Sequence, residues 1–366
     1  MSGVASLFTE EFYARLSEYL NEGGVLSQWV HTYEMDSATL ASIFKAVAKT
    51  FPDFAVYSTI DADIILIARK GGPPGHFDPR ALQIPALHAA LERLKMADAD
   101  VLEHRRIVSW KAIEPLMRTF AMPANSDYFP VVETRATKTR FTRDRANVLL
   151  ELAAAPVPIL EMLDASHAPA GPPREASPVT ASESAPLQAW GIYRALMGED
   201  REALTFAPGS RSSSAIVVRS WATNCRSDLP FETLLPHMMA VAEATNPYLP
   251  ADAAKSMWSW IASSKCGSRL AAADACWLAL FDAVAQRDPE RMVSTARATA
   301  PGRDSPGLDL AVTAAATGYV CLGEYAKAEK LLTDYSGSMN THLFYLLSVS
   351  RAPASRGGLS GPCIAR

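Results

Sequence analysis

The chain has 366 residues, of which 49% are apolar and 20% charged, and its formal net charge is −4 at pH 7. This length allows two or three domains, and the composition is ordinary for a soluble globular protein. The negative net charge does not suggest a basic surface that binds nucleic acid. No apolar run approaches the ~20 residues that span a bilayer. The N-terminus lacks the basic-then-apolar order of a signal peptide, so we expect a cytoplasmic protein without membrane or nucleic-acid partners.

Cysteine spacing argues against a metal site. All five cysteines lie in the second half of the chain and none forms a CxxC pair; they are Cys225, Cys266, Cys276, Cys321 and Cys363. This spacing favours reduced structural thiols over a zinc site or a disulfide framework, and no metal ligands are predicted.

The first elements alternate between helix and strand. Thr9, followed by Glu10 and Glu11, is typical of a helix N-cap with acidic residues in the first turn. We expect the helix to end at Gly23-Gly24 and a strand to run from Val25 to His31.

A second helix and a hairpin follow. Asp36 or Ser37 can cap this helix, whose apolar face is Leu40, Ile43, Phe44, Val47 and Phe51. Runs 54–59 and 63–68 are joined by three residues, which predicts a hairpin. The continuous apolar run 64–67 favours a strand covered on both faces, whereas 54–59 suits an edge.

This order of elements indicates the fold class. Helix, strand, helix, strand and antiparallel strand is how a Rossmann-like methyltransferase sheet finishes. Residues 1–70 are therefore interpreted as the C-terminal half of an α/β domain with about three strands, followed by a mainly α-helical region.

The remaining chain divides by composition. Residues 71–165 are predicted to be a mostly helical extension, and 166–186, with five prolines, a flexible linker. Residues 187–350 are predicted to be all-helical and 351–366 a disordered tail. The segment 322–328 is typical of a tetratricopeptide-type helical hairpin, and a weaker copy lies 35 residues earlier at Arg287-Asp288. An ordinary helical bundle is the alternative.

Several segments together resemble the spermidine/spermine synthase family. They are the runs 2–13 (SGVASLFTEEFY), 23–29 (GGVLSQW), 31–35 (HTYEM) and 125–136 (NSDYFPVVETRA). The resemblance covers about residues 1–145. It implies aminopropyl transfer from decarboxylated S-adenosylmethionine to a diamine such as putrescine.

The same resemblance implies that part of the catalytic machinery is missing. In the family, the glycine-rich loop, the ribose-binding acid and the catalytic carboxylate precede the leucine–phenylalanine pair, which is Leu7-Phe8 here. Only six residues precede Leu7, none is acidic, and no GxGxxG run occurs elsewhere. We therefore expect no catalytic residue and no cofactor in this chain, and no activity alone. A misplaced start, a remnant and half of a split enzyme are three open origins.

The family's site geometry implies which residues contact the substrates. Gln28, Tyr33 and Glu34 are the expected amine contacts, and Leu7 and Phe8 would lie beneath the adenine. The alternatives are a hydrogen-bonded strand polar group for Gln28, a solvated turn carboxylate for Glu34, and core packing for Leu7 and Phe8. His31 is interpreted as a strand histidine, and Asp61 and Asp63 as solvated turn residues.

The family's strand order predicts a free sheet edge. It places 63–68 between the other two strands and leaves 25–31 with unpaired backbone groups, through which copies of the chain could associate. Two function hypotheses stay open: a polyamine aminopropyltransferase that needs more than this chain, and a non-catalytic protein that binds a protein partner through its helical region.

Overall fold

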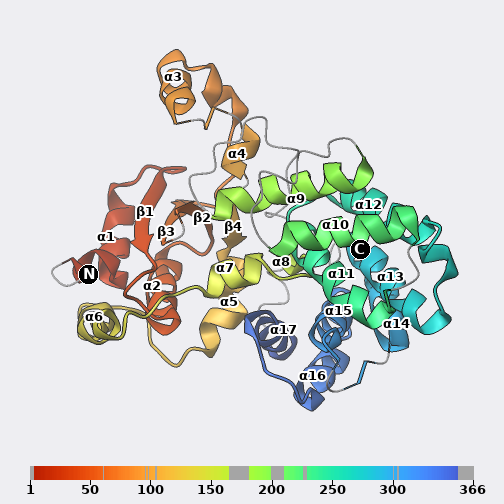
Figure 1. Ribbon diagram of the computed structural model, residues 1–366. Coiled ribbons are helices and arrows are strands. Elements are labelled where there is room, and N and C mark those ends of the chain that lie inside the picture. Colours follow the sequence, from red (N-terminus) through yellow and green to blue (C-terminus); the bar gives the residue numbers. More distant parts are fainter. Residues whose placement is uncertain are drawn as a thin grey trace. The chain divides into compact units, whose positions relative to one another are not determined.

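The computed structural model describes residues 4–352 except 61, 95, 98, 104, 165–180, 199–209, 226–228, 300, 303 and 304. It divides into two compact units (Figure 1). Unit 1 is formed mainly by residues 4–152, and unit 2 mainly by residues 153–164 and 183–351.

Unit 1 combines one sheet with short helices. Its strands are β1 (Val25–His31), β2 (Phe54–Ile60), β3 (Asp63–Arg69) and β4 (Arg106–Ser109). Its helices are η1 (Ala5–Phe8), α1 (Glu10–Tyr19), α2 (Ser37–Thr50), η2 (Pro79–Gln83), α3 (Pro85–Arg93), α4 (Ala99–Glu103), α5 (Trp110–Thr119), α6 (Val131–Thr142) and α7 (Val148–Ala153).

The sheet is antiparallel throughout, with the strand order β1-β3-β2-β4. The Lys70 N–H donates to the Gly24 carbonyl at 2.9 Å and the Thr32 N–H to the Ala62 carbonyl at 2.7 Å. Because backbone bonds alternate along an antiparallel pair, the even-numbered residues of β1 bond to β3. Val25, Ser27, Trp29 and His31 therefore direct their backbone groups away from the sheet, and β1 is its edge.

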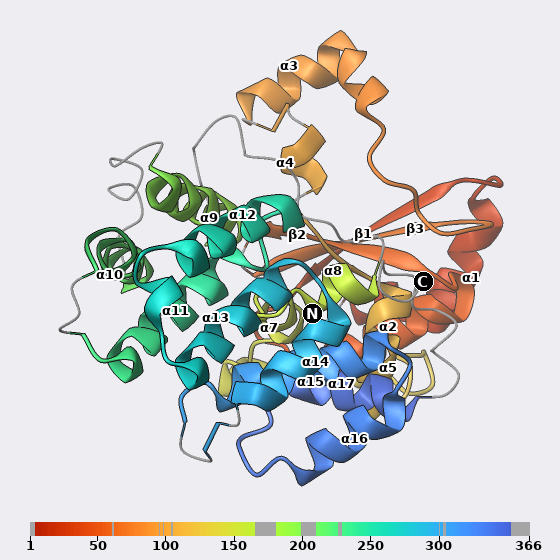
Figure 2. The same ribbon diagram turned by 90° about the vertical axis from the view of Figure 1, so that its right-hand side faces the viewer.

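One face of the sheet carries the core of unit 1. The cross-strand rows Leu26–Ala68–Phe54 and Val30–Ile64–Ser58 point to this face. Phe54 stacks on Trp110 of α5 at 5.4 Å and meets Phe44 of α2 edge-on at 5.4 Å. Figure 2 shows α2 and α5 alongside the strands. Burial of these aromatic rings holds the helices on the sheet.

Two helix caps form as predicted, although one helix ends early. The Thr9 hydroxyl accepts a hydrogen bond from the Phe12 N–H at 3.2 Å, and an Asp36 carboxylate oxygen accepts one from the Thr39 N–H at 2.8 Å. The first helix ends at Tyr19 rather than at Gly23-Gly24. Gly23, with φ of 77°, instead makes the turn into β1, where a residue with a Cβ would be strained.

The sheet itself corrects three expectations. It has four strands rather than three, because 106–109 forms β4 inside the region predicted to be helical. β2 is interior rather than an edge, since β3 and β4 pair with its two sides. Ile65 and Ile67 are only half-buried, so β3 is not fully covered on both faces. The central place of 63–68 between the other two expected strands is confirmed, and the protein is of a mixed α/β, helix-rich class.

In the described part of unit 2, all the regular elements are helices. Its elements are α8 (Ile159–Leu163), α9 (Ala181–Met197), α10 (Ser210–Asn224), α11 (Phe231–Thr245), α12 (Ala251–Ser263), η4 (Gly267–Arg269), α13 (Ala272–Ala285), α14 (Pro289–Thr299), α15 (Leu308–Cys321), α16 (Tyr325–Asp334) and α17 (Thr341–Arg351). Helix turns occur at both predicted hairpin positions: Arg287, with φ of 50°, lies between α13 and α14, and Gly323, with φ of 72°, between α15 and α16.

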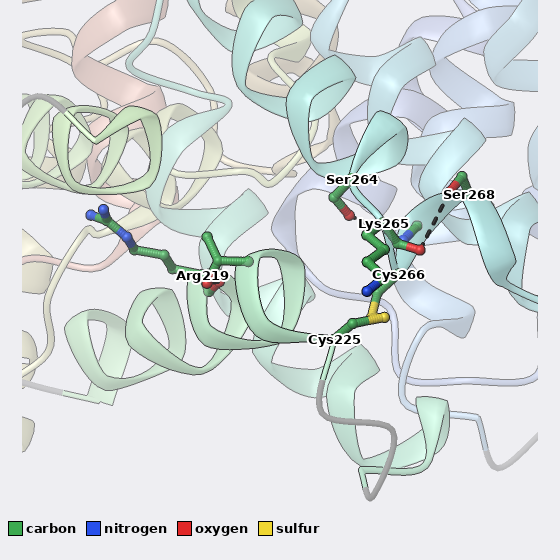
Figure 3. Close-up of a disulfide and its surroundings, with 8 residues drawn as sticks. Arg219, Cys225, Ser264, Lys265, Cys266 and Ser268 are labelled. Atoms are coloured by element: carbon green, nitrogen blue, oxygen red, sulfur yellow. Dashed lines mark hydrogen bonds between the residues drawn. A yellow bond between two sulfur atoms is a disulfide. The ribbon is translucent and has the colours of Figure 1, made fainter.

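Cys225 and Cys266 form a disulfide (Figure 3), and Cys321 is also disulfide-bonded, so the expectation of reduced thiols is wrong for these three cysteines. The Cα atoms of Cys225 and Cys266 lie 5.2 Å apart, although 41 residues separate them in sequence. The bond joins the end of α10 to the turn after α12, and Cys276 is a free thiol. Sequence spacing alone could not reveal this pairing because it depends on how three successive helices fold back.

Most of the predicted linker 166–186 and of the predicted tail 351–366 lies outside the described residues, as does Cys363. The last residues assigned to the linker, from Ala181 onward, belong to α9. Among the described helices, none combines the length and the apolarity needed to cross a membrane.

Candidate functional site: the aromatic face of β1

Three aromatic side chains line the second face of the sheet at its open edge. Trp29, His31 and Tyr33 alternate along the chain, which in a strand brings them to one face. The His31 and Tyr33 rings stack with centroids 4.5 Å apart, and Trp29 lies 5.5 Å from His31. Trp29 remains 50% exposed. We call Trp29, His31, Tyr33, Glu34 and Asp63 the aromatic face.

Two polar atoms on this face are buried without a hydrogen-bond partner. His31 is only 7% exposed, and its Nδ1 has no partner among the described residues. Asp63 lies directly opposite His31 in the β1–β3 register, and its Oδ1 is also buried without a partner. Such groups are costly to leave unpaired. A ligand with hydrogen-bond donors, or ordered water, is therefore expected beside them.

Burial also determines the charge on His31. Removal from water lowers the pKa of His31 below its ordinary value, and the nearby Asp63 and Glu34 carboxylates oppose this only in part. His31 is consequently uncharged at neutral pH. The net charge on the aromatic face then comes from the carboxylates.

Glu34 ends this face in a strained turn. Its φ of 52° lies in the left-handed region, which is uncommon for a residue other than glycine. The backbone on either side is held, because Tyr33 forms a β-bridge with Arg145 and the Met35 N–H donates to the Asp144 carbonyl at 3.2 Å. The Glu34 carboxylate lies 3.8 Å from Arg140, an exposed pair that contributes little energy and leaves the carboxylate accessible.

The face continues across the sheet to β2 and β4. Tyr57 shares the cross-strand row of Trp29 through Ile65, and the Arg106 guanidinium lies 6.0 Å above the Tyr57 ring. Burial raises the pKa of the Tyr57 hydroxyl. This end of the face is therefore already covered by a cation of the protein, whereas the Trp29 end is open.

The structure brings together two of the expected contacts, Tyr33 and Glu34, and separates the third. Gln28 belongs to the opposite face of β1, and its Nε2 donates to the Trp29 carbonyl at 3.0 Å. Phe8 is buried in the core of unit 1 and Leu7 is partly exposed. Asp61 lies outside the described residues.

Trp29 is the site residue that sequence reasoning missed. The available signal was the alternation Trp29-His31-Tyr33, which places aromatic rings on one side of a strand. The alternation becomes visible only when Trp29, His31 and Tyr33 are considered together. Among the described residues, no group of three or more His, Cys, Asp or Glu side chains is arranged to hold a metal ion.

The chemistry of the aromatic face suits an organic cation. Aromatic faces carry partial negative charge and attract ammonium groups within ~6 Å of the ring centroid. The two carboxylates add attraction for the same kind of ligand.

No family model, no curated protein and no solved structure matches this chain.

Proposed function

We propose that the chain is a protein of the spermidine/spermine synthase family whose aromatic face holds the amine substrate, a linear polyamine such as putrescine or spermidine. In this proposal, unit 1 is the C-terminal part of a Rossmann-like methyltransferase domain. It supplies the amine-binding wall for aminopropyl transfer from decarboxylated S-adenosylmethionine.

The observation that carries the proposal is the row of Trp29, His31 and Tyr33 flanked by two carboxylates. A polyamine has ammonium groups spaced along an apolar stem, so its methylene groups can lie on the rings while its ends reach Asp63 and Glu34. The unpartnered Asp63 Oδ1 would accept a hydrogen bond from an ammonium group. The family resemblance of residues 1–145, which includes the run 31–35 on this face, supports the same substrate class.

Calorimetric titration of the full chain with spermidine tests the proposal. Tyr33→Leu keeps an apolar side chain but removes the π face, and Glu34→Gln removes one charge. Each should weaken binding by about two- to fivefold, as expected for exposed cation–π and ion-pair contacts. Two matched controls lie on α1, where Tyr19 and Glu18 are exposed. Tyr19→Leu and Glu18→Gln should leave the affinity unchanged.

Added salt should weaken the binding, because the contacts are largely electrostatic. Absence of spermidine binding, or equal losses in the site variants and the α1 controls, would refute the proposal. Methylthioadenosine, the product of the family's reaction, serves as a second ligand. Tight binding of this nucleoside to the chain alone would contradict the expectation that the nucleotide-binding part is absent.

The packing of unit 2 favours a second candidate function, protein binding through helical hairpins. Helices α13 to α16 form two consecutive hairpins, whose turns at Arg287 and Gly323 are 36 residues apart (323 − 287 = 36). If unit 2 is a tetratricopeptide-type array, as this candidate proposes, its concave surface would bind the partner. A photo-reactive residue at the exposed Phe344 of α17 would test this candidate. Reproducible crosslinking to one protein, without spermidine binding, would favour it over amine binding.

A further inference from the structure

Helix α6 and the turn after it carry a concentrated positive charge. Residues 133–145 contain five basic and two acidic side chains, a net of three positive charges in a chain whose overall charge is −4. Lys138, Arg143 and Arg145 are exposed, and no carboxylate of the described residues lies within ion-pair distance of them. We call Lys138, Arg140, Arg143, Arg145 and Phe141 the basic surface.

A large apolar ring projects from the middle of this charge. Phe141 is 89% exposed. It follows the buried Val132 by nine residues, which at about 3.6 residues per turn is two and a half turns, so it points directly away from the packed side of α6. A phenylalanine in this position gives no benefit to the fold of unit 1. It needs a partner outside the unit to leave water.

Two more exposed aromatic residues lie at the other end of the same helix. Tyr128 and Phe129 are 84% and 69% exposed and directly precede Pro130, the N-cap residue of α6. A helix of this length extends about 18 Å. Exposed aromatic residues therefore occur at both ends of α6, and basic residues occur between and beyond them in the sequence. Figure 1 shows the course of α6.

We propose that this surface docks onto a membrane rich in anionic lipid. Cationic side chains attract the negative headgroups, and aromatic rings at the two ends of a helix enter the boundary between headgroups and acyl chains. The docking is peripheral, with α6 lying along the membrane surface. A single-stranded nucleic acid fits less well, because successive bases stack on neighbouring rings. Rings separated by the length of α6 are too far apart for adjacent bases.

Co-sedimentation of the full chain with vesicles tests this inference independently of amine binding. Vesicles of phosphatidylcholine mixed with phosphatidylserine should bind the chain, and vesicles of phosphatidylcholine alone should not. The double variant Lys138→Glu/Arg143→Glu should weaken binding by at least about tenfold, given the usual contribution of each basic residue near an anionic surface. Phe141→Ser should weaken it further without changing the dependence on salt.

Matched controls separate the basic surface from general charge effects. Lys111 is an exposed lysine on α5, and Lys111→Glu should leave vesicle binding unchanged. Thermal unfolding should show that all variants are folded. Equal effects of Lys111→Glu and Arg143→Glu would overturn the inference. So would binding of a single-stranded oligonucleotide, lost in the double variant, with no binding to anionic vesicles.

Discussion

One group of buried polar side chains in unit 2 differs from one in unit 1 in how its hydrogen bonds are satisfied. In unit 2, Arg287 is almost fully buried, and its guanidinium donates to Glu161 at 2.7 and 3.0 Å and to the carbonyls of Asn246 and Leu249 at 3.1 and 2.9 Å. In unit 1, His31 Nδ1 and Asp63 Oδ1 are buried without such partners. The Arg287 guanidinium therefore finds its hydrogen-bond partners within the protein, whereas His31 Nδ1 and Asp63 Oδ1 do not.

This difference separates a structural role from a binding role. The Arg287 cluster connects α8, the end of α11 and the turn after α13, so its hydrogen bonds stabilise the packing of unit 2. Unpaired groups contribute nothing of this kind and cost free energy. On the aromatic face they lie beside an exposed aromatic row, which is why we propose a binding role there.

The largest expected effect on stability comes from removing the Arg287 guanidinium from its cluster. Arg287→Met leaves the Glu161 carboxylate buried without its cation, which should lower the free energy of unfolding by about 3–5 kcal/mol. Arg351→Met is the matched control, since Arg351 pairs with Glu329 at 2.9 Å on the surface. The control should cost less than about 1 kcal/mol. Urea unfolding measures both, and similar costs would show that the cluster is not structural.

A smaller effect is expected at the cap of α2. Asp36 accepts hydrogen bonds from Thr39 and pairs with Arg135, so Asp36→Ala should cost about 1–2 kcal/mol. Burial tends to raise the pKa of Asp36, but the bonds from Thr39 and Arg135 outweigh it and lower this pKa. The stabilisation is therefore complete above the unfolded pKa of about 3.9 and is lost as the pH falls through the lower folded value.

Carboxyl groups titrate between about pH 6 and pH 2. Unfolding measured over this range tests whether the stabilisation by Asp36 is lost on acidification. The difference in stability between the natural chain and Asp36→Asn should shrink as the pH falls. A difference that grows on acidification would contradict the assigned role of the charged carboxylate.

The smallest effect on stability is expected at His31, whose Nδ1 has no hydrogen-bond partner. His31→Phe keeps a stacked aromatic ring and removes a buried nitrogen that has no partner, so stability should rise slightly or fall by less than about 0.5 kcal/mol. His237 is the matched control, because its Nδ1 lies 3.1 Å from the Ser214 hydroxyl. His237→Phe should cost about 1 kcal/mol. Thermal unfolding compares the two, and a larger loss in His31→Phe would assign His31 a structural role.

Local signals predicted much of unit 1. The caps at Thr9 and Asp36 follow from side-chain chemistry, and the short connection after 54–59 produced the expected hairpin. β4 could not be predicted, because four residues are too few for strand and helix periods to differ. The Cys225–Cys266 bond and the Arg287 cluster depend on contacts between distant segments, which no local pattern contains.

The candidate site was predictable only in part. Tyr33 and Glu34 were expected from the resemblance, and the structure places them together on the aromatic face. The side of the sheet that each residue faces requires the strand register, and this register separates Gln28 from Trp29. The missing partners of His31 and Asp63 required knowledge of every neighbouring side chain.

The most direct test of the aromatic face is a nuclear magnetic resonance titration of the His31 ring with spermidine. We predict that the His31 and Trp29 ring signals shift together and saturably, and that the pKa of His31 falls further as the bound cation opposes protonation. Binding should also weaken as the pH falls and His31 becomes charged. Ring signals that stay unchanged while spermidine binds elsewhere would contradict amine binding at the aromatic face. The absence of any spermidine binding would contradict it as well.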